Sequence, residues 1–312
     1  MELISVHIVG RYESQVNKIR IEISTAESFN WVHVNNPGDA KLIIFFDVLD
    51  HELMKLPAKK VLVRQEPEIV LPENYMFKNV VNFWKIINVG GKPHSDALTV
   101  NWPQDINRDL RIIREKKIGK TVLLNSNLIS LYSSEMYSLR RIAAYKLKEI
   151  DLFGYGWNNS IFSKTKTLIL ELKKYLTKPY KLRLNGLRYY FRSQENYHGE
   201  VANKRSLMQL YSSALIIENS PTYVSEKIFD AFSAGCIPIY IGPNLIDYGI
   251  PNDLFIQAKP NLQSIRESLK SVEKIDYIAW FNRLNTWLKS QECSINWSEE
   301  NYLFRIKKLI DD

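Results

Sequence analysis

The chain has 312 residues, of which 45% are hydrophobic and 24% are charged. This length is too great for one small core and suits two domains of roughly 150 residues, and the composition excludes a disordered chain. The formal net charge of +8 favours an anionic partner, which could be a nucleotide sugar, a nucleic acid or a lipid surface.

No run of about 18 apolar residues is present, and the N-terminus has neither a basic segment nor a small-residue cleavage site. We therefore expect a cytoplasmic protein without a membrane span. The two cysteines, Cys236 and Cys293, are too few for a disulfide framework. Both are expected to be free thiols.

Short apolar and β-branched runs predict an α/β domain over residues 1–118. The charged stretch Pro103–Lys120 is expected to contain the crossing to a second domain, residues 119–295, which a C-terminal segment, 296–312, follows. The strands expected in the first domain are Glu2–Val9, Trp31–Val34, Ala40–Phe46, Lys60–Arg64, Val80–Trp84 and Leu98–Trp102.

The second domain is predicted to open with the buried strand Thr121–Asn125 and the amphipathic helix Met136–Lys148. A strand over residues 151–153 then runs into Gly154–Gly156, which could approach a phosphate or form a plain turn. After Gly242 two or three amphipathic helices are expected, over Asn261–Val272, Asp276–Leu288 and Trp297–Ile310.

Residues 158–197 interrupt the alternation of strands and helices. They carry nine lysines and arginines against two glutamates, interleaved with aromatic residues. Such a segment could rest on anionic lipid headgroups, guide a charged acceptor, or form a solvated excursion on the surface.

A strand–helix–strand unit is the most informative part of the chain. Ala214–Ile217 is a buried strand, the helix begins at Ser220 or at Ser225, and Cys236–Ile241 is the next strand. Gly235 is expected to cap the helix at its C-terminus, and the buried helix face is expected to hold Ile228, Phe229 and Phe232.

Polar residues gather where the first of these strands ends and the helix begins. They are Glu218, Asn219, Tyr223, Glu226 and Lys227. A lysine in the first turn opposes the helix dipole, so a bound anion would explain it, whereas the alternative is an exposed Glu–Lys pair. A carboxylate could hold a ribose diol and a tyrosine could lie against a base or sugar.

The sequence of this unit contains Glu-Asn, followed by Tyr-Val-Ser-Glu-Lys-Ile-Phe-Asp-Ala and Gly-Cys-Ile-Pro-Ile-Tyr-Ile-Gly. It closely resembles the signature of the inverting α-1,3/1,4-fucosyltransferase family. The resemblance covers residues 137–157 and 197–243 and is looser over 60–75. It implies a GT-B type α/β fold with two Rossmann-like domains facing a central cleft, and a terminal helix that returns to the first domain. Family members more often have arginine where His198 stands, which leaves the role of His198 open.

The resemblance also implies roles for single residues. Arg140 and Lys227 would contact the donor diphosphate, Tyr223 and Glu226 the nucleoside, and Asn219 the fucose. Glu218 would stand behind these groups, and Lys204 ends a glycine-containing element that precedes the signature. Glu66 corresponds to the family's catalytic base, with Glu68 in reserve, and the two carboxylates would raise one another's pKa if the strand continued through Pro67.

Metal-free catalysis follows from the sequence, which lacks an Asp-x-Asp motif and any metal-ligand spacing among its five histidines and two cysteines. We expect no metal and no cofactor beyond the donor, GDP-fucose, with fixed cations at the diphosphate.

The expected activity is transfer of L-fucose in α-1,3 linkage to a GlcNAc-containing acceptor, an oligosaccharide or a lipid-linked glycan, in surface polysaccharide synthesis. The expected location is cytoplasmic, peripheral at the inner face of a bacterial membrane through residues 158–197. The alternatives are a transferase for another GDP-linked deoxysugar, a basic nucleic-acid-binding protein, and a non-catalytic glycan- or lipid-binding module; nucleic acid is not the expected partner.

Overall fold

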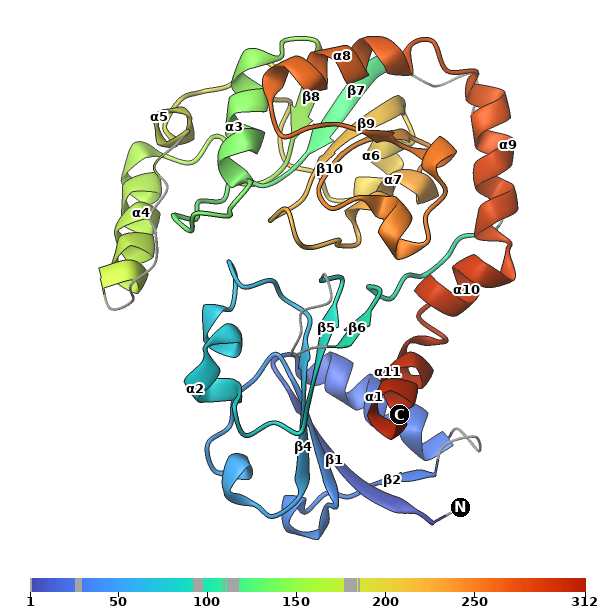
Figure 1. Ribbon diagram of the computed structural model, residues 1–312. Helices are drawn as coiled ribbons and strands as arrows, with labels where there is room; N and C mark the ends of the chain where they lie inside the picture. Colours follow the sequence, from blue (N-terminus) through green and yellow to red (C-terminus); the bar gives the residue numbers. More distant parts are fainter. Residues whose placement is uncertain are drawn as a thin grey trace. The chain divides into compact units, whose positions relative to one another are not determined.

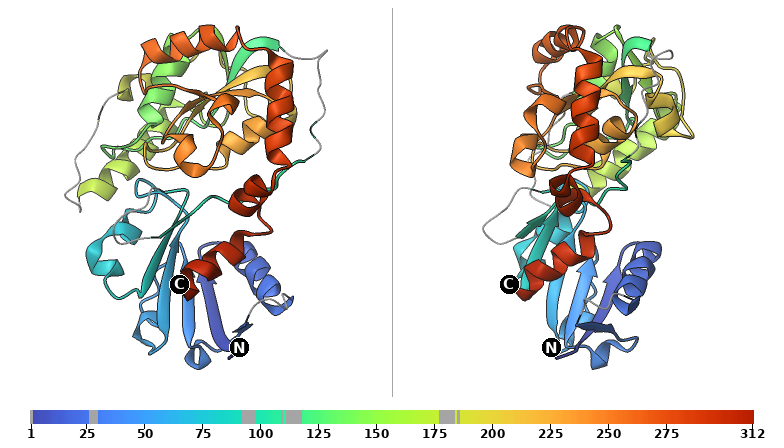
Figure 2. Two further views of the ribbon diagram at one scale, coloured as in Figure 1. Left: turned by 45° about the vertical axis from the view of Figure 1, so that its right-hand side comes forward. Right: turned by 90° about the vertical axis from the view of Figure 1, so that its right-hand side faces the viewer.

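The computed structural model describes residues 2–25, 30–91, 98–108, 110, 118–176, 184 and 186–312 (Figures 1 and 2). The chain forms two compact units, one of Met1–Pro103 with Glu299–Asp312 and one of Gln104–Ser298. The first boundary falls earlier than residue 118 because residues beyond Pro103 belong to the second unit. There the Gln104 N–H donates to the Trp297 carbonyl at 2.8 Å, and Leu110 packs against the core.

The first unit is built on a parallel sheet of six strands in the order β2-β1-β3-β4-β5-β6. β3 is buried along its whole length, as expected for a strand covered on both faces. The strands are β1 (Ile4–Gly10), β2 (Trp31–His33), β3 (Leu42–Phe46), β4 (Lys59–Arg64), β5 (Lys85–Val89) and β6 (Leu98–Val100).

Two helices from opposite ends of the chain cover one face of this sheet. They are α1 (Glu13–Thr25) and α11 (Tyr302–Asp311), whose apolar residues share one core with β1, β3 and β4. α2 (Phe77–Val80) and neighbouring loops cover the other face. The C-terminal helix is therefore part of the first unit, and Lys85 Nζ donates to the carbonyls of Leu309 and Ile310 at its end.

Two sequence-based assignments are wrong. Val80–Trp84 is not a strand, because the Phe83 N–H donates to the Val80 carbonyl in a turn and the Phe83 ring packs edge-on against Phe45 at 5.3 Å. A short apolar run cannot by itself distinguish a strand from a buried turn. Trp297–Ile310 is not one helix, because it joins the last residue of α10 (Gln291–Trp297) to α11 through residues 298–301, of which Ser298 is extended. Helix α1 was not predicted.

The second unit is built on a parallel sheet of five strands in the order β11-β10-β9-β7-β8. β8 pairs with one edge of β7 and β9 pairs with the other, so the chain changes direction between β7 and β9. Ligands of such sheets bind beyond the carboxyl ends of the strands at this switch point. The strands are β7 (Ile118–Leu124), β8 (Ile150–Phe153), β9 (Tyr211–Ile217), β10 (Ile237–Ile241) and β11 (Ile256–Gln257).

Helices pack on both faces of this second sheet (Figure 1). One face holds α3 (Tyr137–Lys146) and α8 (Leu262–Val272). The other face holds α6 (Lys204–Met208), α7 (Lys227–Ser233), α9 (Tyr277–Leu288) and α10. None of the helices in the described ranges has both the length and the apolar character needed to cross a bilayer.

The ends of α7 show how the local sequence sets this unit. Ile228, Phe229 and Phe232 are buried as predicted. Gly235 has φ +64° and lies directly after the helix, where the Cys236 N–H donates to the Ala231 carbonyl at 2.9 Å. The predicted glycine cap is thus confirmed, and Cys236 and Cys293 are free and buried, as expected.

The basic segment 158–197 is partly helical. It contains α4 (Ile161–Leu176) and α5 (Leu187–Tyr190), and Leu168 of α4 packs against a small core with Tyr190. Lys178, Tyr180, Lys181 and Arg183 lie outside the described residues.

Gly154 ends β8 at a point where only glycine fits. Its φ is +130°, and an added Cβ would lie 2.3 Å from the Asn125 backbone oxygen. We expect Gly154→Ala to lower the free energy of unfolding by about 3 kcal/mol or more, since backbone strain and a steric overlap add together. Urea denaturation measures the change.

Gly199→Ala is the matched control. Gly199 also has a positive φ, +115°, but no atom lies within 4 Å of an added Cβ. It should lose only the strain contribution, about 1–3 kcal/mol. Equal losses in the two variants would contradict the steric explanation.

Candidate functional site

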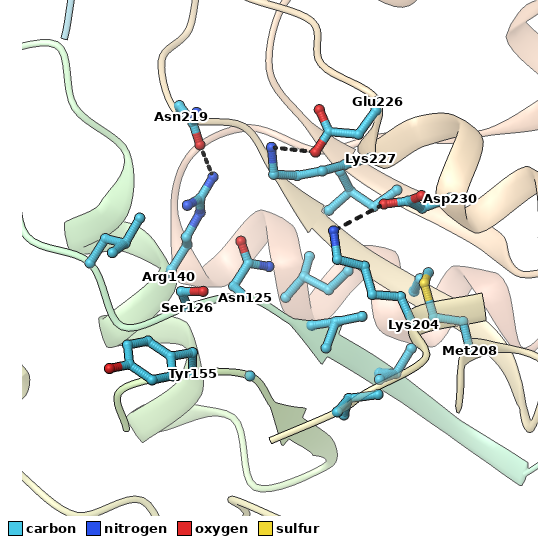
Figure 3. Close-up of a pocket in the computed structure, with 18 of the residues that line it drawn as sticks. Asn125, Ser126, Arg140, Tyr155, Lys204, Met208, Asn219, Glu226, Lys227 and Asp230 are labelled. Carbon is cyan, nitrogen blue, oxygen red and sulfur yellow. Dashed lines mark hydrogen bonds and ion pairs between the residues drawn. The ribbon is translucent and has the colours of Figure 1, made fainter. Parts of the chain in front are cut away.

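A cavity of about 380 Å³ opens in the second unit at the carboxyl ends of β7 and β9 (Figure 3). This volume lies within the range of ligand-binding clefts, and the position is the switch point of the sheet. Apolar side chains of both strands form part of its lining, with Met208 of α6. The charged residues that line it are Arg140, Glu200, Lys204, Glu226, Lys227 and Asp230.

Arg140 of α3 lines the cavity and is buried, with the residue only 3% exposed. Its Nε and Nη2 donate to the Ile217 carbonyl at the end of β9, at 3.0 and 2.5 Å, and Nη2 donates to Asn219 Oδ1 at 2.8 Å. Burial lowers the pKa of Arg140, opposed by the Tyr137 hydroxyl and nearby carboxylates. The side chain is therefore a positive charge whose position is fixed by hydrogen bonds to the end of β9 and to Asn219.

Asn219 belongs to the same arrangement. Its backbone carbonyl accepts a hydrogen bond from the Met136 N–H at 2.9 Å, directly before α3. The loop after β9 and the start of α3 are thus tied together twice, through the Asn219 backbone and through its side chain on Arg140.

Lys227, the first residue of α7, stands over a buried carboxylate. Glu218 is fully buried and accepts hydrogen bonds from the Ser225 N–H at 3.0 Å, the Ser225 hydroxyl at 2.7 Å and the Tyr240 hydroxyl at 3.2 Å. Lys227 Nζ lies 3.5 Å from Glu218 Oε2 and 2.7 Å from Ser225 Oγ. Because Glu218 explains a cation at this position, the lysine alone does not require a bound anion.

Two loose ion pairs lie in the cavity wall. Lys204 Nζ lies 3.9 Å from Asp230 Oδ2, and Lys227 Nζ lies 3.9 Å from Glu226 Oε1 (Figure 3). Burial acts to raise the pKa of Glu226, but Lys227, a backbone hydrogen bond, Lys204 and Arg140 together hold it below its ordinary value. Burial raises the pKa of Asp230, against the opposing effect of Lys204. These ammonium groups remain within reach of an anionic ligand.

Five predicted site residues therefore come together in one cavity, and two others of the second unit do not line it. Arg140, Lys204, Asn219, Glu226 and Lys227 line the cavity, and Glu218 lies buried beneath Lys227. Tyr223 is 4% exposed and is absent from the cavity lining that the described residues form.

Sequence reasoning missed part of the lining. Asn125 and Ser126 follow β7, and the exposed Tyr155 lies between the two glycines after β8. Asn125 ends the predicted strand Thr121–Asn125. Tyr155 belongs to Gly154–Gly156, for which approach to a phosphate was one of two predictions, and Gly154 also lines the cavity. Because the carboxyl ends of parallel strands share one edge, this placement was the available signal.

His198 occupies a different place. Its Nε2 lies 3.2 Å from Asp151 Oδ1, which Lys120 Nζ approaches at 3.0 Å, and the Tyr211 hydroxyl donates to Asp151 Oδ2 at 3.0 Å. The His198 ring also stacks on Phe153 at 5.2 Å. His198 thus takes part in a polar cluster around Asp151, and it is not one of the described residues that line the cavity.

Glu66 lies in the first unit, two residues after β4. β4 ends at Arg64, and the N–H groups of Val70 and Leu71 donate to the Pro67 carbonyl in a turn. The strand therefore does not continue through Pro67, so the condition for coupling Glu66 to Glu68 along one strand face is not met.

Asp47, which sequence reasoning missed, is the carboxylate that supports Glu66. It directly follows β3, is 5% exposed, and accepts the N–H groups of Gln65 at 2.9 Å and Glu66 at 3.1 Å. The Tyr75 hydroxyl donates to the Glu66 carbonyl at 3.1 Å, so both backbone polar groups of Glu66 are held. Burial raises the pKa of Asp47 to about 7, with the Glu66 carboxylate adding to the effect and the two N–H groups opposing it.

No group of three or more His, Cys, Asp or Glu residues is placed to hold a metal ion within the described ranges. The positive charges in the cavity wall belong to Arg140, Lys204 and Lys227.

The stability contribution of Asp47 should depend on pH. Its pKa in the folded chain, about 7, lies above the ordinary value of 3.8, so the folded state binds this proton more tightly. The contribution is complete below about pH 4 and is lost as the pH rises through about 7. We expect the stability difference between Asp47→Asn and the wild type to shift in favour of the variant by about 1–4 kcal/mol from pH 4 to pH 8.

Urea denaturation of both proteins at several pH values measures this shift, and taking the difference cancels the titration of all other groups. A difference that stays constant across this pH range would contradict the raised pKa.

Comparisons with known proteins agree with the resemblance seen in the sequence. No family model matches the chain. Over 95 residues it is 34% identical to 4-galactosyl-N-acetylglucosaminide 3-alpha-L-fucosyltransferase 9 of Cricetulus griseus, and the same enzyme of Homo sapiens matches to the same degree. The match covers 27% of this chain and 26% of each relative, about a quarter of the relatives' length. The predicted resemblance to the fucosyltransferases is confirmed over this segment.

Solved structures resemble the whole chain. A crystal structure of an α1,3-fucosyltransferase aligns with 100% of this chain and 91% of its own at 13% identity, with a TM-score of 0.52, and its complex with GDP gives 0.50. The Anabaena protein Alr3699/HepE with UDP and glucose aligns over 99% of both chains at 10% identity, with a TM-score of 0.53. At these identities the likeness shows the fold, and it confirms the predicted GT-B type with two Rossmann-like domains.

Proposed function

We propose that the protein is a glycosyltransferase that moves L-fucose from GDP-fucose to a hydroxyl of a GlcNAc-containing glycan, in α-1,3 linkage and with inversion at C1. The relatives that match 95 residues of the chain are named as enzymes of this activity, and a structural neighbour of the same activity was solved with GDP. The activity of the whole protein is inferred from these partial likenesses and from the cavity.

The observation that carries the proposal is the cavity at the β7–β9 switch point, with Arg140, Lys204 and Lys227 in its wall. A departing diphosphate needs positive charge that is already in place, because fixed charges in a cleft need no reorganisation during the reaction. Arg140 meets this requirement best, since its guanidinium is buried and held by the Ile217 carbonyl and Asn219.

The other groups of the cavity receive roles that fit their chemistry. In this proposal Lys227 and Lys204 approach the diphosphate, Glu226 accepts hydrogen bonds from the ribose diol, and Asn219 contacts the fucose. Glu218 acts through Lys227 by holding its ammonium group. Tyr223 is kept as a nucleoside contact on the resemblance alone, because its side chain is buried.

Glu66 is the proposed base, and Glu68 remains its reserve. As the acceptor oxygen bonds to C1 of fucose, the bond from C1 to the diphosphate oxygen breaks and its electron pair leaves with GDP. Glu66 takes the proton of the acceptor hydroxyl, which completes the balance of the reaction. The hydrogen bonds of the Glu66 backbone to Asp47 and Tyr75 would fix the position from which the Glu66 side chain extends.

The proposed reaction requires no metal and takes an oligosaccharide or a lipid-linked glycan as acceptor. We place it in the cytoplasm, which the two free buried cysteines favour, because thiols persist in reducing compartments. Activity that EDTA abolishes and manganese restores would contradict the metal-free part.

Arg140→Lys should weaken transition-state stabilisation although it keeps the charge. An ammonium cannot reproduce the fork of contacts to Ile217 and Asn219 and still face two phosphate oxygens. We expect kcat/KM to fall about 100-fold, with GDP affinity falling less than kcat. Initial-rate kinetics and calorimetric titration with GDP measure the two effects.

The matched control for this change is Arg188→Lys on α5, which lies away from the cavity lining. It should retain kcat/KM within about twofold. An equal loss in both variants would show that Arg140 has no special place in the reaction.

A panel of GDP-sugars offered with N-acetyllactosamine tests donor and base together. We expect product with GDP-fucose, a loss of about 100-fold or more in kcat for Glu66→Gln, and a loss below about tenfold for Glu68→Gln. The opposite order would assign the base to Glu68. Liquid chromatography with mass detection identifies the product and its linkage.

The panel also separates the remaining alternatives. Turnover with another GDP-linked deoxysugar and none with fucose would replace the proposed donor. If no donor turns over, GDP does not raise the melting temperature and RNA binds with steep salt dependence, the protein is a nucleic-acid-binding protein instead.

A further inference from the structure

Helix α4 has its polarity reversed relative to an ordinary surface helix. Its inward residues are largely polar: Lys164 is 4% exposed and donates to the Trp157 carbonyl at 3.0 Å, and Glu171 is 6% exposed. Leu168 is the apolar residue that packs on the small core with Tyr190. A surface helix normally turns its apolar stripe towards the protein, so α4 is anchored by charges and leaves its apolar side outward.

The outward side of α4 is an apolar strip that the exposed Thr165 interrupts. With roughly 100° of rotation per residue, Ile161, Leu172, Ile169 and Phe162 fall within an arc of about 100°. Phe162 is 81% exposed, Ile161 70%, Ile169 47% and Leu172 38%. We call these four residues the outward face. Figure 1 shows α4 beside α5 at the edge of the second unit, apart from its strands.

Charge borders the outward face on one side. Lys173 and Lys166 lie at roughly 120° and 140° on the same scale, and both are exposed. Glu171 is the one acidic residue between Ile161 and Leu176, and it points inward. The exposed part of α4 thus combines apolar residues with positive charge and no exposed negative charge among its described side chains.

We propose that the outward face of α4 binds an anionic lipid bilayer, with its apolar residues at the level of the acyl chains and Lys166 and Lys173 at the headgroups. An exposed apolar strip marks an interaction surface, and lysines beside it suit negatively charged lipid. A protein partner fits less well, because lysine is depleted at protein interfaces and the described outward side chains include no Trp, Tyr or Arg. This inference goes beyond the proposed function and does not depend on the donor.

Sedimentation of the full chain with vesicles tests the proposal. The vesicles contain about three parts phosphatidylcholine to one part phosphatidylglycerol, with phosphatidylcholine alone as the comparison. We expect the wild type to bind the anionic vesicles at least about tenfold more strongly, and to lose most of this preference at about 0.5 M salt.

Two variants divide the apolar and charged contributions. Phe162→Glu with Ile169→Glu should reduce binding to the anionic vesicles at least about tenfold. Lys166→Glu with Lys173→Glu should remove the preference for anionic lipid. The matched control is Ile246→Glu with Phe304→Glu, whose parent side chains are 53% and 55% exposed and lie outside α4, and it should change binding less than about twofold.

Three outcomes would overturn the proposal. They are equal binding to both kinds of vesicle, unchanged binding of the Phe162→Glu, Ile169→Glu variant, and loss of binding in the control pair to the same extent. If light scattering shows a concentration-dependent dimer that only the Phe162→Glu, Ile169→Glu variant abolishes, and no vesicle binding occurs, the face binds a second copy of the chain instead.

Discussion

The carboxylate of Glu218 is the interaction on which the candidate site depends. It is fully buried at the end of β9, and a buried charge persists only when hydrogen bonds and an opposite charge surround it. Ser225, Tyr240 and Lys227 supply them from the loop before α7, the next strand and the first turn of α7. These contacts fix the loop after β9 from one side, while Arg140 and the Met136 N–H fix it from the other. The loop can therefore present Asn219 to the same cavity that Lys227 of α7 lines.

Both units use the same strand order around their first strand, and this places chemistry at equivalent edges. β7 lies between β8 and β9 as β1 lies between β2 and β3. In the second unit the switch point holds the cavity, and in the first unit the residues that follow β3 and β4 include Asp47 and Glu66. Parallel strands leave their carboxyl ends at one edge of the sheet. A cavity at the strand ends of one unit and carboxylates at the strand ends of the other follow from the same topology.

The sequence predicted those parts of the structure that depend on local pattern. Two strands were predicted correctly, Thr121–Asn125 and Ala214–Ile217. Their apolar runs have the length and composition of strands that are buried on both faces of a sheet. Val80–Trp84 was wrong because a short apolar run also fits a buried turn. Two interactions could not be predicted, since both depend on how separate segments meet. They are the pairing of Lys227 with Glu218, nine residues away across a loop, and the hydrogen bond from the Glu66 N–H to the Asp47 carboxylate. The resemblance located the candidate residues, and the structure supplied their partners.

Two features of the second unit do not add to the folding stability of the chain by itself. Burying Arg140 and Glu218 removes charges from water, and replacing such groups with apolar residues is often neutral or stabilising. Leaving Phe162 and Ile161 exposed forgoes burial worth about 1.5–3 kcal/mol for each side chain. Departures from the rules of core formation are expected at functional sites, where a protein contacts a ligand or another surface. The first departure belongs to a cavity of about 380 Å³, with Arg140 in its wall and Glu218 beneath Lys227. The second lies on an outer helix, where a membrane surface can cover what the fold leaves uncovered.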